Sequence, residues 1–433
     1  MDIRENVANI TENARENERA ELYKTIWNIA TDLRGSVDGW DFKNYVFTTL
    51  FYRYVSENLT NYINKNEWAA GNTDFDYAKI SDEWADDIKN DIVESKGFFI
   101  KPSELFCNVV ESAKNDLKNK SESNLNERLS QIFRAIQNTA KGTNSEKNVN
   151  GLFSDFDVNS NKLGNSTKTR NQKLANLLIS IAGINFNINS DTSIDTFGDA
   201  YEYLMGMYAA NAGKSGGEYF TPQEVSELLT KIALNGRDHI NTIYDPCCGS
   251  GSLLLKGAKL LGENANDIHY YGQEVNITTY NLCRINMFLH DVGYENFDIA
   301  NADTLLEPAF QNQHGFDAIV SNPPYSTTWP GSNDPLLIND ERFSPAGVLA
   351  PKSKADLAFV MHCLANLSVD GTAAIVCFPG IMYRGGAEQK IRKYLIDNNY
   401  IDAVIQLSDK LFYIISNLYT VENSHGIRYE LAA

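Results

Sequence analysis

Apolar side chains recur at helical spacing through the first 145 residues of the chain. Tyr45, Leu50 and Tyr54 belong to a predicted helix over residues 41–59, and a second amphipathic pattern runs over residues 116–140. Such spacing brings apolar positions onto one face of a helix, where they can be buried together. The pattern predicts an all-α N-terminal domain, which we place at residues 1–165.

The pattern changes after an irregular, Asn- and Ser-rich stretch, and from about residue 240 short apolar runs alternate with helical segments. These runs lie at residues 242–244, 269–273, 318–321, 373–377 and 403–406. Such alternation is typical of a parallel sheet. The predicted fold class is therefore α/β, with a Rossmann-like sheet in a second domain over residues 166–412. Ligands of such sheets bind at the carboxyl ends of the strands, so the residues after each strand are the candidates.

A glycine-rich turn follows the first predicted strand. It runs from Asp245 to Gly251 and leads into a helical pattern. Gly249 and Gly251, with Ser250 between them, allow a tight turn, and the helix N-terminus offers backbone N–H donors to a ligand. Leu254 stands where a dinucleotide-binding motif has its third glycine, which disfavours a dinucleotide site. A tight turn with no ligand remains an alternative at this point.

Acidic residues follow the next two predicted strands. Glu274 comes after residues 269–273, where a carboxylate can accept hydrogen bonds from ribose hydroxyls. Asp303 follows a predicted third strand, and its carboxylate suits an adenine amino group. Taken alone, Asp303 is more typical of a residue that caps a turn, so both roles depend on the neighbouring motifs.

The most specific motif is Asn322-Pro323-Pro324-Tyr325, which follows an apolar strand over residues 316–321. Two consecutive prolines fix the backbone and remove two N–H donors. The Asn322 side-chain oxygen and the Pro323 carbonyl remain as acceptors, and Tyr325 offers a flat face. This arrangement suits a planar ring stacked on Tyr325, with an exocyclic amine that donates to both acceptors. It requires neither a metal nor a strong base.

In this order, the motifs resemble those of S-adenosylmethionine-dependent amino methyltransferases. Upstream, residues 216–222 resemble the cofactor-binding motif that precedes the glycine turn in one class of DNA methyltransferases. The N-terminal region and residues 199–204 resemble one family of that class, the modification subunit of type I restriction-modification systems. The similarity covers about residues 20–412. It implies adenine-specific methylation of DNA with S-adenosylmethionine as cofactor.

The resemblance also implies a role for each matching residue. Residues 217–222 and the glycine turn would bind the methionine end of the cofactor, Glu274 its ribose and Asp303 its adenine. The target adenine, flipped out of the duplex, would be held by the motif after the fourth strand. The implied cofactor-binding residues are Gly217, Glu218, Tyr219, Phe220, Thr221, Pro222, Asp245, Gly249, Ser250, Gly251, Glu274 and Asp303, and the implied catalytic residues are Asn322, Pro323, Pro324 and Tyr325.

The charge of the chain affects the expected mode of DNA binding. The net charge is −18 and the pI is about 4.8. Because each phosphate contact needs Lys or Arg, we do not expect the chain to bind DNA by bulk attraction. Too few residues follow Tyr325 for a target-recognition domain of usual size. The resemblance implies that a separate specificity subunit reads the DNA, with two modification subunits per specificity subunit and a restriction subunit for cleavage.

Cysteine usage and hydropathy indicate the compartment. The six cysteines include no Cys-x-x-Cys pair, which disfavours a disulfide framework or a zinc site. No apolar run approaches about 20 residues, and the charged N-terminus lacks a signal-peptide core. We expect a cytoplasmic protein with no metal site and no membrane partner.

Two alternatives to DNA methylation stay open. Asn-Pro-Pro-Tyr motifs also serve enzymes that methylate a protein glutamine or an RNA base. In addition, residues 413–433 depart from the family pattern, in which a Gly-Thr-Ser turn and a further strand follow a stretch like residues 411–413. We expect a truncated or altered C-terminus there, which makes a catalytically impaired assembly subunit the second alternative.

Overall fold

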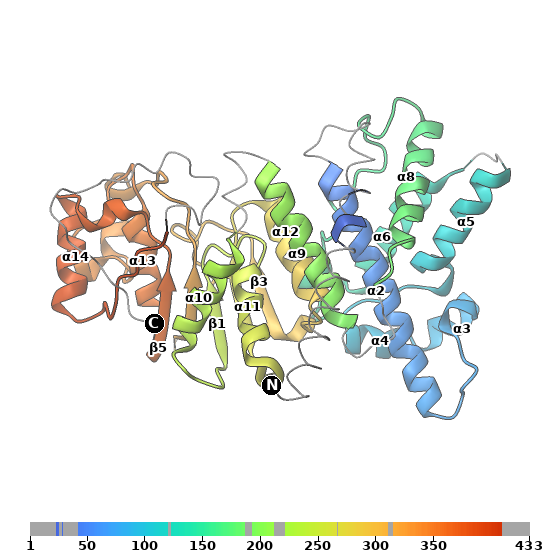
Figure 1. Ribbon diagram of the computed structural model, residues 1–433, viewed down its shortest axis with the longest axis horizontal. Coiled ribbons are helices and arrows are strands. Elements are labelled where there is room, and N and C mark those ends of the chain that lie inside the picture. The colour runs from blue at the N-terminus through green and yellow to red at the C-terminus, as the bar shows by residue number, and fades with distance from the viewer. Residues whose placement is uncertain are drawn as a thin grey trace, which may run out of the picture. The chain divides into compact units, whose positions relative to one another are not determined.

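The computed structural model describes residues 23–25, 28, 42–119, 123–186, 193–211, 221–265, 267–310 and 315–408. The chain forms two compact units (Figure 1). The first contains Met1–Tyr208 and Ile285–Glu295, and the second contains Ala209–Arg284 and Asn296–Ala433. None of the described helices combines the length and the apolar character that crossing a bilayer requires.

The described part of the first unit is helical and contains no strand. Its helices are α2 (Phe42–Ala69), α3 (Asp82–Asp87), α4 (Lys89–Lys96), α5 (Phe106–Asn119), α6 (Leu125–Thr139), α7 (Glu146–Val149), α8 (Thr167–Ala182) and α9 (Ser193–Asn211, whose last residues belong to the second unit). The helix predicted over residues 41–59 is the first part of the longer α2. The single helix predicted over residues 116–140 is wrong, because α5 ends at Asn119 and α6 begins at Leu125. There the Ser123 hydroxyl accepts from the Leu125 N–H, a local bond that replaces the helical pattern.

Helix α8 packs in the first unit, although the predicted domain boundary assigned it to the second. It lies against α2, α5 and α6 and buries Leu174, Leu178 and Ile181. An amphipathic helix buries its apolar side against whichever apolar surface is available, and here that surface is formed by three helices. The compact units therefore divide the chain later than residue 165.

The second unit contains a five-stranded, wholly parallel sheet in the order β3-β2-β1-β4-β5. The strands are β1 (Thr242–Asp245), β2 (His269–Gln273), β3 (Phe297–Ala300), β4 (Phe316–Ser321) and β5 (Leu367–Ile375). The helices are α10 (Gln223–Leu234), α11 (Ser252–Leu261), α12 (Ile277–Leu289, whose last residues belong to the first unit), α13 (Asp356–Ala365) and α14 (Ala387–Asp397). The predicted strand at residues 403–406 does not form: within the described residues that stretch pairs with no strand, and its side chains are exposed or half-buried.

Both faces of the sheet are covered, as neighbouring residues of β1 indicate. Ile243 points toward α11, where a Cβ on Gly257 would lie 3.1 Å from its Cδ1 atom. The next residue, Tyr244, points the other way and bonds to His362 of α13. Because successive side chains of a strand face opposite sides, α11 and α13 lie on opposite faces. β1 pairs with both β2 and β4, so the strand order reverses beside it. Such a reversal is where doubly wound sheets bind ligands.

Phe133 lies at the centre of the aromatic core of the first unit. Its ring stacks on Phe153 at 4.4 Å between centroids and meets Tyr52 and Phe156 edge-on. We expect Phe133→Ala to lower the free energy of unfolding by about 3–5 kcal/mol, the usual cost of emptying such a position. Chemical denaturation measures the loss. The matched control is Leu117→Ala on the exposed side of α5, which should cost far less.

Candidate functional site

The predicted site residues of the second unit meet at one edge of the sheet. Asp245 is the last residue of β1, whereas Glu274, Asp303 and Asn322 follow β2, β3 and β4, and all four strands are parallel neighbours. Their carboxyl ends therefore lie side by side. Residues 217–220 of the predicted site lie outside the described residues, whereas Thr221 and Pro222 immediately precede α10.

The glycine turn joins the end of β1 to the end of β2. Gly249 and Gly251 have φ angles of +53° and +81°, in the left-handed region that favours glycine. Gly251 directly precedes α11 as its N-cap residue. The backbone N–H of Cys248 donates to the Gln273 carbonyl at 3.0 Å. Two glycines thus let the turn fold back onto the neighbouring strand.

Asp245 is a fully buried carboxyl at the end of β1. Its Oδ1 atom accepts from the Cys247 N–H at 2.9 Å, whereas its Oδ2 atom has no hydrogen-bond partner of normal geometry. Burial raises the pKa of Asp245 to about 7, against smaller lowering effects of the Cys247 N–H and the Ser321 hydroxyl. The carboxyl is therefore half-ionised near neutral pH and keeps one oxygen for a further donor.

Glu274 holds the glycine turn with one oxygen and its own loop with the other. Oε2 accepts from the Gly249 N–H at 3.2 Å, and Oε1 accepts from the Asn276 N–H at 2.7 Å. Burial raises the pKa of Glu274, although these backbone donors oppose the shift. Because each carboxylate oxygen has a second lone pair, both can still accept a hydrogen bond from a ligand.

Asp303 caps the loop that follows β3. Its Oδ1 atom accepts from the N–H groups of Leu305 and Leu306 at 2.9 and 3.2 Å. Within the described residues no donor contacts Oδ2, and the side chain is half-buried. The turn-capping role and a ligand-binding role are therefore compatible, since each uses a different oxygen.

Asn322 is oriented by partners on both ends of its amide. Its Nδ2 atom donates to the Thr221 hydroxyl at 3.2 Å, and its Oδ1 atom accepts from the Tyr325 hydroxyl. Burial raises the pKa of Tyr325, so that hydroxyl keeps its proton at neutral pH. The contact brings together residues 221 and 322, which belong to separate sequence motifs, and leaves a second lone pair on Oδ1.

Two contributors to the site carry no motif of their own. The Thr304 hydroxyl donates to the Pro246 carbonyl and ties the loop after β3 to the glycine turn. The Asp356 carboxylate accepts from the Ser326 N–H at 3.0 Å and holds the chain just past Tyr325. Both contacts join residues at least 30 positions apart, so no local sequence pattern predicts them. The described residues contain no cluster of His, Cys, Asp or Glu that could hold a metal ion.

Comparison with known proteins now supplies the family. The profile described as N-6 DNA Methylase matches residues 192–420, and the one described as HsdM N-terminal domain matches residues 22–181. The chain is 51% identical to the type I restriction enzyme MpnII methylase subunit of Mycoplasma pneumoniae, over 93% of this chain and 75% of that protein. The chain belongs to the N-6 DNA methylase family.

Other relatives agree. The type I restriction enzyme MjaVIII methylase subunit of Methanocaldococcus jannaschii is 35% identical over 52% of this chain, which spans 39% of that relative. The crystal structure of a type I restriction-modification methyltransferase subunit from Streptococcus thermophilus superposes with a TM-score of 0.76 at 36% identity. That match covers 89% of this chain and 80% of the other.

Membership of the N-6 DNA methylase family confirms the main predictions made from the sequence. These are a helical N-terminal domain followed by a parallel α/β methyltransferase domain, S-adenosylmethionine as cofactor, and N6-adenine methylation of DNA. The resemblance to modification subunits of type I systems is confirmed with them.

Replacing Asp245 with Asn should change how stability depends on pH. An unfolded Asp loses its proton near pH 4, whereas the folded chain keeps this proton up to about pH 7. The wild-type free energy of unfolding should therefore fall relative to that of Asp245→Asn as the pH rises from about 4 to about 7, and the difference should level off above. Denaturation across this pH range measures it, and a pH-independent difference would contradict the raised pKa.

Proposed function

We propose that this chain transfers a methyl group from S-adenosylmethionine to the exocyclic amine of a flipped adenine, through the residues at the carboxyl edge of the sheet. The observation that carries the proposal is the oriented amide of Asn322 at the end of β4, which neighbours the buried carboxyl of Asp245 at the end of β1. One strand thus offers acceptors for an amine, and its neighbour offers an acidic group for a cationic ligand.

The residues fit S-adenosylmethionine by the chemistry of their free acceptors. The unpartnered Oδ2 atom of Asp245 suits the ammonium at the methionine end, and Gly249 to Gly251 let the backbone approach it closely. Glu274 would accept from the ribose hydroxyls, and the Oδ2 atom of Asp303 would accept from the adenine amine. When bound, the cofactor supplies a methyl group already activated on a cationic sulfur.

The Asn-Pro-Pro-Tyr segment would hold the target adenine. The Thr221 hydroxyl fixes the amide so that Oδ1 of Asn322 faces the binding region, where it and the Pro323 carbonyl accept the two amine hydrogens. The Tyr325 ring would stack on the base, while its hydroxyl keeps its bond to the same Oδ1 atom. Rigid acceptors of this kind orient the amine lone pair toward the methyl group, so most of the rate gain would come from positioning.

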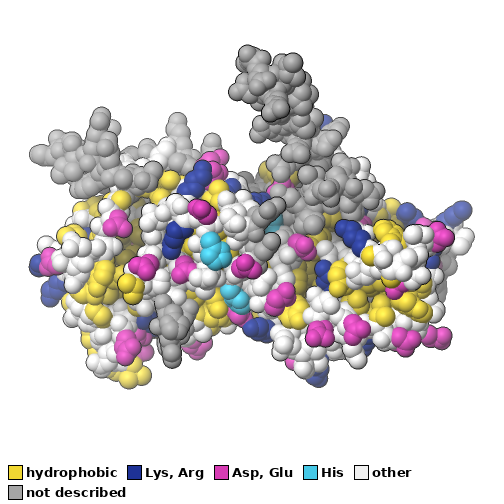
Figure 2. All heavy atoms as spheres, turned by 90° about the horizontal axis from the view of Figure 1, so that it is seen from below, with side chains coloured by type: hydrophobic (Ala, Val, Ile, Leu, Met, Phe, Trp, Pro, Cys, Tyr) yellow, Lys and Arg dark blue, Asp and Glu magenta, His cyan; other side chains and the backbone are white. Residues whose placement is uncertain are grey.

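We further propose that the chain works in a complex with DNA, a specificity subunit and a restriction subunit, with two modification subunits per specificity subunit. The family relation to type I methylase subunits supports this. The net charge of −18 supports a division of labour, because another subunit must then provide most phosphate contacts. On the face drawn in Figure 2, Lys and Arg are interspersed with acidic side chains rather than gathered into one patch. All six cysteines are free thiols, which fits the cytoplasm as the proposed compartment.

Two substitutions at Tyr325 test the target-base role. Tyr325→Phe keeps the ring but loses the bond to Asn322, so methylation should fall modestly. Tyr325→Ala also loses stacking and should lower kcat by about 10–100-fold, the usual value of one base–aromatic stack. The readout is incorporation of labelled methyl groups into plasmid DNA by the complex with the specificity subunit. Tyr400→Phe, at an exposed tyrosine, is the matched control.

Cofactor binding separates the possible outcomes of that experiment. Both Tyr325 variants should bind S-adenosylmethionine as the wild type does. If the wild type binds the cofactor yet labels a protein glutamine or an RNA base instead of DNA, the proposed substrate is wrong. If the wild type binds no cofactor, the chain is an assembly subunit rather than an enzyme.

The charge distribution makes a separate prediction about salt. The chain alone should bind DNA weakly, and the affinity should depend only slightly on salt concentration. Addition of the specificity subunit should raise both the affinity and the slope of log K against log [salt], because that slope counts the phosphates contacted. Fluorescence anisotropy with a labelled duplex measures both. A steep slope for the isolated chain would contradict this division of labour.

A further inference from the structure

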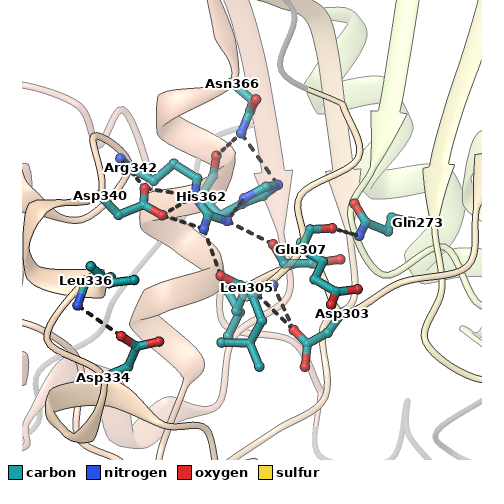
Figure 3. Close-up of polar contacts among 12 residues, drawn as sticks. Gln273, Asp303, Leu305, Glu307, Asp334, Leu336, Asp340, Arg342, His362 and Asn366 are labelled. Carbon is teal, nitrogen blue, oxygen red and sulfur yellow. Dashed lines mark hydrogen bonds and ion pairs between the residues drawn. The ribbon is translucent and has the colours of Figure 1, made fainter.

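Arg342 is a buried arginine whose five N–H donors all have acceptors (Figure 3). Nε and Nη2 donate to the carboxylate of Asp340, and Nη2 also donates to the Leu305 carbonyl at 2.7 Å. Nη1 donates to the Thr304 carbonyl at 2.8 Å and to the Nδ1 atom of His362 at 3.0 Å. None of these groups belongs to a motif used above, and the arginine contacts no residue assigned to the substrates.

The two backbone carbonyls that Arg342 binds are those of the residues directly after Asp303. They belong to the loop that presents this carboxylate at the edge of the sheet, where the Oδ1 atom of Asp303 caps the N–H groups of Leu305 and Leu306. The loop is therefore gripped from both sides: Asp303 binds its N–H groups, and Arg342 binds its carbonyls. Together these contacts fix where the free Oδ2 atom of Asp303 points.

His362 connects this arginine to the first strand. Burial, with the neighbouring Arg342, lowers the pKa of His362 to about 3, so the ring is neutral. Nδ1 accepts from Arg342, so the proton lies on Nε2, which donates to the Tyr244 hydroxyl at 3.0 Å. Tyr244 directly precedes Asp245. A rigid chain of contacts thus joins the loop after β3 to the end of β1.

Further contacts fix the far end of the same loop to β2. The Gln273 side chain donates to the Glu307 carbonyl at 2.8 Å and accepts from the Ala309 N–H at 3.1 Å. The Thr304 hydroxyl adds the bond to Pro246 in the glycine turn. These three are neutral hydrogen bonds, whereas Arg342 supplies charge-assisted ones, which are about twice as strong.

We propose that Arg342 is a positioning residue that aims Asp303 at the 6-amino group of the cofactor adenine and so sets the discrimination of the site for that amine. The inference rests on the proposed function, which assigns Asp303 to the cofactor adenine. The arginine itself touches neither cofactor nor DNA. Its effect is on how strongly the free chain prefers an adenine ring over a ring without the amine.

The experiment compares two ligands on wild type and Arg342→Lys. One ligand is S-adenosylhomocysteine, and the other is its purine analogue, in which hydrogen replaces the 6-amino group. Calorimetry on the full chain gives the ratio of the two Kd values. The wild type should bind the purine analogue about tenfold or more weakly than S-adenosylhomocysteine, because the analogue lacks the amine that makes a charge-assisted hydrogen bond to Asp303. Lysine keeps the charge but cannot bind both carbonyls and His362 at once, so the ratio should fall to about twofold.

A merely structural role for Arg342 predicts a different result. General loosening of the fold would weaken the binding of both ligands equally and leave the ratio of their Kd values unchanged. Arg237→Lys is the matched control, because that arginine also binds backbone carbonyls, those of Ala233, Leu234 and Asp317, at the opposite end of β4. It should lower the melting temperature without changing the ratio.

A second variant keeps the proposal testable if Arg342→Lys does not fold. Asp340→Asn removes one carboxylate anchor of the guanidinium at a partly exposed position, and it should lower the ratio in the same direction by a smaller factor. An unchanged ratio in the folded variant, or no discrimination by the wild type, overturns the inference and leaves the proposed function standing. Failure of the wild type to bind S-adenosylhomocysteine at all overturns both.

Discussion

The site depends on the close approach of two backbones, where the glycine turn after β1 folds against the end of β2. The Cys248 N–H reaches the Gln273 carbonyl, and the Gly249 N–H reaches the Glu274 carboxylate. The approach has little room to spare, since a Cβ at Gly272 would lie 2.9 Å from the Cys248 sulfur. Glycine at the positive-φ positions of the turn makes this geometry accessible without strain. Because Glu274 is held by the turn itself, the proposed ribose acceptor and the proposed methionine-binding turn form one unit.

Electrostatics at this edge follow from burial more than from net charge. Asp245 and Glu274 both have raised pKa values because burial disfavours their charged forms. The described residues place no Lys or Arg within ion-pair distance of either carboxyl. A cationic ligand would therefore be the partner that makes ionisation favourable, which suits a sulfonium cofactor with an ammonium group.

The local sequence pattern was sufficient to predict those elements of the fold whose position depends on neighbouring residues in the chain. The strands β1, β2 and β4, the glycine turn and the acidic residues after β2 and β3 could be predicted, because turns and strand ends have sequence signatures. The last strand, β5, was placed too late, since it begins at Leu367 and the predicted run began at residue 373. The break between α5 and α6 and the missing strand at residues 403–406 could not. At the first, the Ser123 hydroxyl accepts from the Leu125 N–H between the two helices, and at the second no described strand pairs with the stretch. The placement of α8 likewise depends on which apolar surface is near, a property of the folded chain.

The network around Arg342 could not be predicted either, because its partners come together only in the folded chain. Its contacts also explain why a charged residue is buried there. A buried charge is often no better for stability than apolar packing of the same volume. Here an apolar replacement would leave the Thr304 and Leu305 carbonyls and the Nδ1 atom of His362 buried without a donor. Each unsatisfied group costs about 1–3 kcal/mol. The acceptors around it therefore require an arginine at this position. Asp303 caps the N–H groups of the loop after β3, and the carbonyls of Thr304 and Leu305 then point toward the interior. Only a branched, charged side chain can donate to both carbonyls and to His362 at once.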